Sequence, residues 1–252
     1  MMAKRGEIYL GTSGLVLPYK NRQAYPAEFE GQSRMMVYGK LFNSIEINSI
    51  FYKLPRPATI GEWTRAVRQD FRFTFKLWKQ ISHSPSLKFN EVDVERFFEV
   101  IEPAREKAGC ILVQFPPSVK AALFQEVSSL LETLQHFNKN RWSVAVEFRS
   151  PSWYTSRTFD LLNTNQLAMV YHDKSGSQSP HQELDADIIY LRFHGPNGNY
   201  KGSYDQGFLY EYAGYVSAWQ DAGKTVYVYF NNTMGAALEN LRTLEKFMAE
   251  DE

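Results

Sequence analysis

Eight short runs of β-forming residues recur along this sequence, and most of them are bounded by turn residues or by a helical pattern. Apolar residues spaced three and four apart fill several of the intervals, which indicates helices with one buried face. This alternation predicts parallel strands joined by crossovers. The runs are Glu7–Thr12, Ser44–Asn48, Arg72–Leu77, Cys110–Phe115, Ser143–Phe148, Leu167–Tyr171, Ile188–His194 and Thr225–Phe230.

Eight strand–helix units favour a single α/β domain over residues 1–252, folded as a (β/α)₈ barrel of the triosephosphate-isomerase (TIM) type. The chain has 252 residues, and such barrels typically need about 250. An open, doubly wound sheet is the alternative. That fold normally places a G-x-G-x-x-G loop after its first strand, whereas this chain has Gly11-Thr12-Ser13-Gly14 followed by a long loop.

Charge and cysteine content exclude several classes of protein. The 28 Lys and Arg residues balance 28 Asp and Glu residues, so the basic excess typical of nucleic-acid binders is missing. Cys110 is the only cysteine, which rules out an intrachain disulfide and fits a reducing compartment. The sequence shows neither a signal peptide nor an apolar run of the ~18 residues that a membrane helix needs. We therefore expect a cytoplasmic protein with no membrane or nucleic-acid partner.

Strand parity predicts a polar site at one end of the barrel. Side chains alternate between the two faces of a strand, and the outward face of a barrel strand contacts helices. Assigning the apolar residues of each run to the outward face turns polar residues inward. In the sixth run this reasoning leaves His172 and Asp173 as alternatives. The inward polar residues at or near the strand ends are Glu46, Asn48, Lys76, Gln114, Glu147, Arg149, Arg192, His194, Tyr229 and Asn231.

These residue types point to acid–base chemistry on a small polar or anionic substrate. Catalytic residues in TIM barrels come from the carboxyl ends of several strands. Glu46 and Glu147 are candidate general acid and base, because different surroundings can separate the pKa values of two carboxyls. His194 is a candidate proton carrier, since imidazole titrates near neutrality.

The cationic and aromatic residues are candidates for substrate binding. Lys76, Arg149 and Arg192 are expected to bind a phosphate or carboxylate group, arginine through its planar fork. Three long connections, at residues 15–33, 78–90 and 174–187, follow strands and are expected to cover the site. We expect further contacts from Asn48, Gln114 and Asn231 and pocket walls from Tyr52, Trp153 and Tyr229.

Two other functions and one structural role fit the same residues. Glu46, Glu147 and His194, with His172 or Asp173, offer the ligand types of a metal-dependent enzyme. The cations on the same rim oppose a divalent ion, and no motif such as H-x-H is present, so we predict no metal and no other cofactor. A non-catalytic ligand-binding barrel is the second alternative. The structural alternative is a buried salt-bridge network with no ligand.

Short motifs follow one another along nearly the whole chain. They are Gly11-Thr12-Ser13-Gly14, Glu46-Ile47-Asn48-Ser49 with Phe51-Tyr52 and Pro55, Phe75-Lys76, Gln114-Phe115-Pro116-Pro117, Glu147-Phe148-Arg149 with Ser152-Trp153, Tyr190-Leu191-Arg192-Phe193-His194-Gly195, and Phe230-Asn231-Asn232-Thr233. This ordered set resembles the domain of unknown function seventy-two family, also called YecE-like. The resemblance implies a TIM-type barrel and brings no settled activity. This chain has Leu15 where the family usually has Trp, and Ser150-Pro151 where a His is common.

Overall fold

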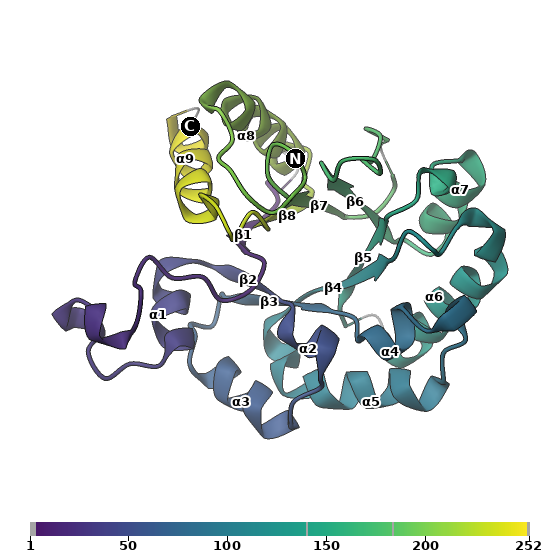
Figure 1. Cartoon of the computed structure of the whole chain (residues 1–252), viewed down its shortest axis with the longest axis horizontal. Coiled ribbons are helices and arrows are strands. Elements are labelled where there is room, and N and C mark those ends of the chain that lie inside the picture. Colours follow the sequence, from purple (N-terminus) through teal and green to yellow (C-terminus); the bar gives the residue numbers. More distant parts are fainter. Residues whose placement is uncertain (1–3, 140, 183, 251–252) are drawn as a thin grey trace.

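The protein is a barrel of eight parallel strands with helices outside it, as predicted (Figure 1). The structure is a computed structural model that describes residues 4–139, 141–182 and 184–250. Each predicted strand is present, with ends that differ from the prediction by at most a few residues. The strands are β1 (Ile8–Thr12), β2 (Ser44–Ile47), β3 (Arg72–Lys76), β4 (Ala108–Phe115), β5 (Ser143–Phe148), β6 (Ala168–His172), β7 (Ile188–Phe193) and β8 (Thr225–Phe230).

Helices form most of the crossovers, and side-chain caps fix where several of them begin. Ser33 accepts a hydrogen bond from the Met36 N–H at the start of α1, and Asp205 accepts one from Phe208 at the start of α8. Residues 173–187, between β6 and β7, form no helix where the structure describes them. The helices are α1 (Arg34–Leu41), α2 (Ser49–Tyr52), α3 (Pro57–Arg65), α4 (Lys79–Ser82), α5 (Glu91–Ile101), α6 (Phe124–Asn138), α7 (Ser156–Thr164), α8 (Gln206–Asp221) and α9 (Ala237–Glu250).

The predicted strand parity is confirmed by two separate clusters of buried residues. Outward strand residues such as Ile45, Phe75 and Val146 belong to the large cluster shared with the helices. A second cluster, which includes Leu112 and Tyr190, fills the barrel interior. Because this interior is packed, the space for a ligand lies at the strand ends rather than through the barrel.

Side chains close the barrel where β1 meets β2. Strand β8 pairs with β1 in parallel, as predicted. Between β1 and β2, the described residues form a single isolated bridge, Ser13 with Glu46. The Tyr38 hydroxyl accepts from the Thr12 N–H at 2.8 Å and donates to the Ser44 carbonyl at 3.2 Å. The Asn43 amide bonds the N–H of Leu10 and the carbonyl of Ile8, both at 2.8 Å. These two side chains therefore replace ladder hydrogen bonds that the strands do not make with each other.

The two strands nevertheless approach closely at Gly11. A Cβ atom at this position would lie 2.2 Å from the Ser44 carbonyl oxygen, so only glycine fits without moving a strand.

Among the described helices, none combines the length and the apolar character that crossing a bilayer requires.

The seam, by which we mean the junction of β1 and β2, predicts that removing the Tyr38 hydroxyl lowers stability. Tyr38→Phe leaves the buried Thr12 N–H without its partner, and we expect a loss of about 1–3 kcal/mol in the free energy of unfolding. Chemical denaturation measures this loss. Tyr215→Phe is the matched control, because its hydroxyl bonds Glu211 on the helix surface, and we expect a change within about 0.5 kcal/mol. Equal effects of the two substitutions would contradict the role given to Tyr38.

Candidate functional site

A buried arginine joins three strand ends at the mouth of the barrel. Arg192 lies at the end of β7 and is 2% exposed. Its Nε is 2.9 Å from Glu46 Oε2, and its Nη2 is 2.8 Å from Glu46 Oε1. Its Nη1 is 3.2 Å from Glu147 Oε2. The two glutamates predicted from strand parity are thus brought together through one guanidinium group.

Glu46, at the end of β2, has both carboxylate oxygens occupied. Besides Arg192, it accepts from the Tyr190 hydroxyl at 2.6 Å and from Asn48 Nδ2 at 3.0 Å. Burial opposes its ionisation, but the charge and hydrogen bonds of Arg192 outweigh burial and lower the pKa of Glu46 below its ordinary value. Glu46 is therefore held as an anion.

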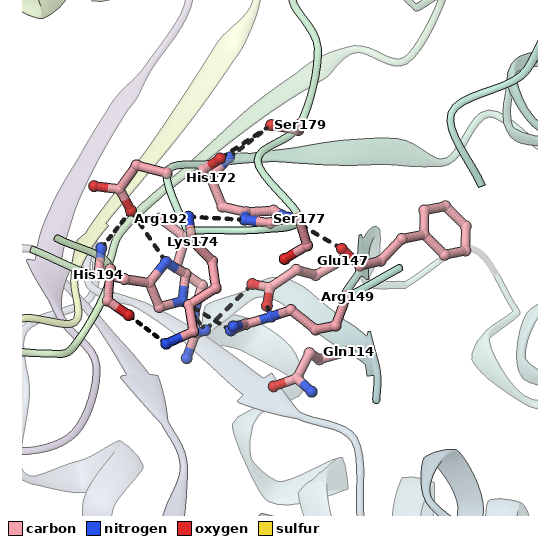
Figure 2. Close-up of polar contacts among 12 residues, drawn as sticks. Gln114, Glu147, Arg149, His172, Lys174, Ser177, Ser179, Arg192 and His194 are labelled. Carbon is pink, nitrogen blue, oxygen red and sulfur yellow. Dashed lines mark hydrogen bonds and ion pairs between the residues drawn. The ribbon is translucent and has the colours of Figure 1, made fainter. Parts of the chain in front are cut away.

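Glu147, at the end of β5, lies between two arginines. It accepts from Arg149 Nε as well as from Arg192 (Figure 2). Burial again opposes ionisation, but the charges of Arg149 and Arg192 hold the pKa of Glu147 well below its usual range. Both glutamates are fully buried and lie beneath the mouth rather than on its surface. Their predicted part in proton transfer stays a prediction.

The hydrogen bonds of His194 define its tautomer. Its Nε2 is 2.9 Å from Arg149 Nη2 and 2.8 Å from Arg192 Nη1. A guanidinium group only donates hydrogen bonds, so this nitrogen accepts both, and the proton lies on Nδ1. Nδ1 then donates to Asp173 Oδ1 at 3.2 Å. Burial lowers the pKa of His194 to about 4, even though Asp173 favours the charged form. The imidazole is therefore neutral near pH 7.

His172 and Asp173, the alternatives left by strand parity, both belong to the site. His172 continues the inward parity of β6, and its Nε2 lies 3.1 Å from the Phe148 carbonyl. Asp173 lies just beyond the strand. It accepts from the backbone N–H of His194 at 2.7 Å and from the Tyr204 hydroxyl. His172 thus links β5 to β6, whereas Asp173 orients His194.

Two adjoining cavities open above the network, which consists of Glu46, Glu147, Arg149, Arg192 and His194. They share Gln114, Arg149 and Tyr200 and form one groove across the strand ends. The smaller, of about 160 Å³, is lined by Asn48, Phe51, Tyr52, Lys76, Gln114, Arg149, Arg192, Tyr200 and Asn231. The larger, of about 440 Å³, is lined by His83, Gln114, Pro116, Pro117, Arg149, Lys174, Ser175, Gly176, Ser177 and Tyr200.

Cationic groups line this groove, whereas the carboxylates lie below it. Within the described chain, Arg149 Nη1 makes no hydrogen bond, although Nε and Nη2 bond Glu147 and His194. Lys76 Nζ bonds Gln114 Oε1 at 2.8 Å and lies 4.1 Å from the centre of the Phe51 ring. No carboxylate of the described residues lies within ion-pair distance of Lys76. Lys174 Nζ bonds the Gly198 carbonyl above the Tyr200 ring. The groove therefore offers positive charge to a ligand.

Most of the residues predicted to bind substrate line the groove, but two do not. Trp153 is fully buried, donates to the Val119 carbonyl at 2.7 Å and stacks on Phe148. The Tyr229 hydroxyl is bonded to Ser44 and Thr74 inside the barrel. The prediction that these two rings wall the pocket is therefore wrong. The predicted residues that do line the groove are Asn48, Tyr52, Lys76, Gln114, Arg149, Arg192 and Asn231.

His83, Lys174 and Tyr200 line the groove but were missed by the sequence reasoning. His83 and Lys174 belong to two of the long connections that were expected to cover the site. That expectation was the available signal, but loops have no periodicity from which to select a residue. Among the described residues, no group of three His, Cys, Asp or Glu side chains is arranged to hold a metal ion.

Comparison with known proteins agrees with the motifs along the chain. The profile of the family described as "Protein of unknown function DUF72" matches residues 9–252. The chain belongs to the DUF72 family.

Two curated relatives are similar to this DUF72 protein, and both carry names without a function. The UPF0759 protein YecE of Escherichia coli K12 is 27% identical over 124 residues, which are 49% of this chain and 44% of YecE. The chain thus matches less than half of the length of YecE. The UPF0759 protein YunF of Bacillus subtilis 168 is 22% identical over 258 residues, with 90% of this chain and 89% of YunF covered.

Solved structures of DUF72 proteins share the fold. One from Enterococcus faecalis V583 has a TM-score of 0.80 at 22% identity and covers 96% of this chain and 95% of its own. One from Thermotoga maritima MSB8 has a TM-score of 0.77 at 25% identity and covers 96% of this chain and 99% of its own. These likenesses support the barrel fold.

The network predicts a large loss of stability for Glu147→Gln. The neutral amide leaves Arg149 and Arg192 short of a buried counter-charge, and we expect a loss of about 3–5 kcal/mol in the free energy of unfolding. Glu102→Gln is the matched control, because Glu102 pairs with Arg141 on the surface, where ion pairs contribute about 0–1 kcal/mol. Denaturant titration of both variants measures the difference. A loss for Glu147→Gln as small as that of the control would contradict the network described here.

The pKa of His194 predicts how stability depends on pH. The folded-state pKa is about 4, against an ordinary value of 6.5. Between these values the unfolded chain takes up a proton that the folded chain does not, so stability falls as the pH falls from about 6.5 to about 4. In His194→Gln, the free energy of unfolding is expected to fall less steeply over this range. Identical slopes for the variant and the wild type would contradict the prediction.

Proposed function

We propose that this DUF72 protein is an acid–base enzyme that acts on a small anionic substrate bound in the groove across the strand ends. One observation carries the proposal: Arg149 lines both cavities of the groove, and its Nη1 makes no hydrogen bond within the described chain. Charge-assisted hydrogen bonds from arginine to carboxylate or phosphate are among the stronger polar contacts in proteins. The group most suited to this position is therefore an oxyanion.

The network beneath the groove prepares Arg149 for binding. Glu147 and His194 hold two of its three nitrogens (Figure 2), so little side-chain freedom is lost when a ligand engages the third. Every nitrogen of Arg192, by contrast, already has a partner in the network. The substrate contact therefore belongs to Arg149, with Lys174 as a second cation on the same groove.

Two groups that face the groove are suited to proton transfer. Burial, together with the charge of Arg192, lowers the pKa of Lys76 to about 8. Burial also lowers the pKa of His83 to about 4, so its imidazole is neutral near pH 7. Because Glu46, Glu147 and His194 are saturated by the arginines, we propose that they position Arg149 and Arg192, while Lys76 and His83 move protons.

Anion binding tests the proposal. Isothermal titration calorimetry with oxalate and with inorganic phosphate is expected to detect binding to the wild type. Arg149→Lys keeps the charge but loses the fork, and the loss of a charge-assisted contact worth about 1.5–3 kcal/mol lowers affinity tenfold or more. Arg141→Lys, outside the groove, is the control and is expected to bind as the wild type does. Equal affinities for Arg149→Lys and the wild type, or no binding at all, would overturn the site.

Catalysis itself is tested by proton exchange. The wild type is incubated in D₂O with a panel of small carboxylates and phosphate esters, and NMR follows exchange of their carbon-bound protons. We expect exchange with at least one compound, lost in Lys76→Met and retained in Lys246→Met, whose side chain is exposed on α9. Binding without any exchange would identify a non-catalytic ligand-binding barrel instead.

A further inference from the structure

Lys76, which is half-buried, differs from Lys107, which is buried. Lys107 is 5% exposed, and its Nζ bonds two backbone carbonyls, of Thr64 at 2.7 Å and of Val67 at 2.6 Å. Those bonds tie it to the carboxyl end of α3, a structural role. Lys76 Nζ makes one hydrogen bond within the described chain, to Gln114. Its remaining donor positions, or a lone pair once the amine is deprotonated, are therefore available at the groove.

We propose that Lys76 is the nucleophile of this site and forms an imine with the carbonyl carbon of a small 2-oxo acid, whose carboxylate binds Arg149. This inference rests on the proposed function, because it uses the same groove and the same arginine. Lys76 and Arg149 both line the smaller cavity, whose volume of about 160 Å³ suits a compound of a few heavy atoms. A 2-oxo acid carries its carboxylate next to the reactive carbonyl, so a molecule bound in this cavity would offer the carboxylate to Arg149 and the carbonyl to Lys76.

The surroundings of Lys76 favour an uncharged amine. Lys76 is half-buried at the groove, and removal from water disfavours the charged form of its amine. Arg192 and Arg149 disfavour a further positive charge nearby, and no carboxylate of the described chain pairs with the ammonium group. These conditions lower the pKa of Lys76 to about 8, so a useful fraction of the amine carries its lone pair near neutral pH.

The reaction consumes no oxidant or reductant. The Nζ lone pair of Lys76 attacks the carbonyl carbon, a C–N bond forms, and the carbonyl oxygen takes up a proton while Nζ loses one. The resulting carbinolamine then loses its hydroxyl group with a proton as water, and the C=N bond forms. The net change is one amine and one carbonyl giving one imine and one water.

A hydrogen-bonded row beside Lys76 ends in a proton acceptor, His83, with the Gln114 amide between them as an orienting group. Gln114 accepts from Lys76 through Oε1, which leaves its Nε2 as a donor, 3.5 Å from His83 Nε2. His83 Nε2 then accepts, and its Nδ1 carries the proton toward Ser82 Oγ at 2.9 Å. The contact between Gln114 and His83 is long, and when it opens, the lone pair of His83 Nε2 accepts the proton that Nζ releases and returns it to the leaving hydroxyl.

Reductive trapping tests the inference. The full chain is incubated with glyoxylate or pyruvate and sodium cyanoborohydride, which reduces an imine to a stable secondary amine. Mass spectrometry of the intact chain and of its peptides then locates the adduct. We expect one dominant adduct, on Lys76, with complete loss of that adduct in Lys76→Arg and no loss in Lys246→Arg. Adducts distributed over exposed lysines, with Lys76 unmodified, would overturn the inference.

Competition in the wild type keeps the test independent of any folding defect in the variant. Oxalate has the carboxylates but no ketone or aldehyde, so it is expected to suppress trapping at Lys76 and to leave surface lysines unaffected. If oxalate binds with dependence on Arg149 but no adduct forms on Lys76, the imine is wrong and the proposed anion site stands. If oxalate neither binds nor protects, both proposals fail.

Discussion

The site is organised around one buried guanidinium group. Arg192 lies at the centre of the barrel mouth, and a charge removed from water must be compensated by partners close to it. Glu46 and Glu147 supply that compensation from β2 and β5. The ends of three strands that lie far apart in the sequence are thus tied to one side chain. The positions of the neighbouring groups follow from this arrangement.

The network divides the mouth into two layers of opposite character. Below, Glu46 and Glu147 are each bonded by arginine, and His194 is fixed as a neutral acceptor because two guanidinium groups donate to it. Above, Arg149 and Lys76 face the groove. A neutral protein therefore carries a locally positive pocket, and its buried acids serve to hold the cations in place rather than to cancel them at the surface.

Strand periodicity made the fold and the lower layer predictable, because inward and outward residues alternate and the outward ones are apolar. The same rule selected Lys76 and Arg149. The rule fails farther beyond the strand ends. Trp153 lies five residues past the end of β5 and packs against Phe124 and Phe148, and His83 and Lys174 lie in connections that have no periodicity. The seam between β1 and β2 could not be predicted either, since Tyr38 and Asn43 act from outside the strands.

We propose Nη1 of Arg149 as the anion-binding element of this barrel. A crystal structure of the protein soaked with oxalate would show whether it is. We expect oxalate in the groove, with one carboxylate hydrogen-bonded to Nη1 of Arg149 and the contacts of Arg192 to Glu46 and Glu147 unchanged. Oxalate bound elsewhere on the chain, or an occupied groove in which Arg149 makes no contact with the ligand, would contradict it.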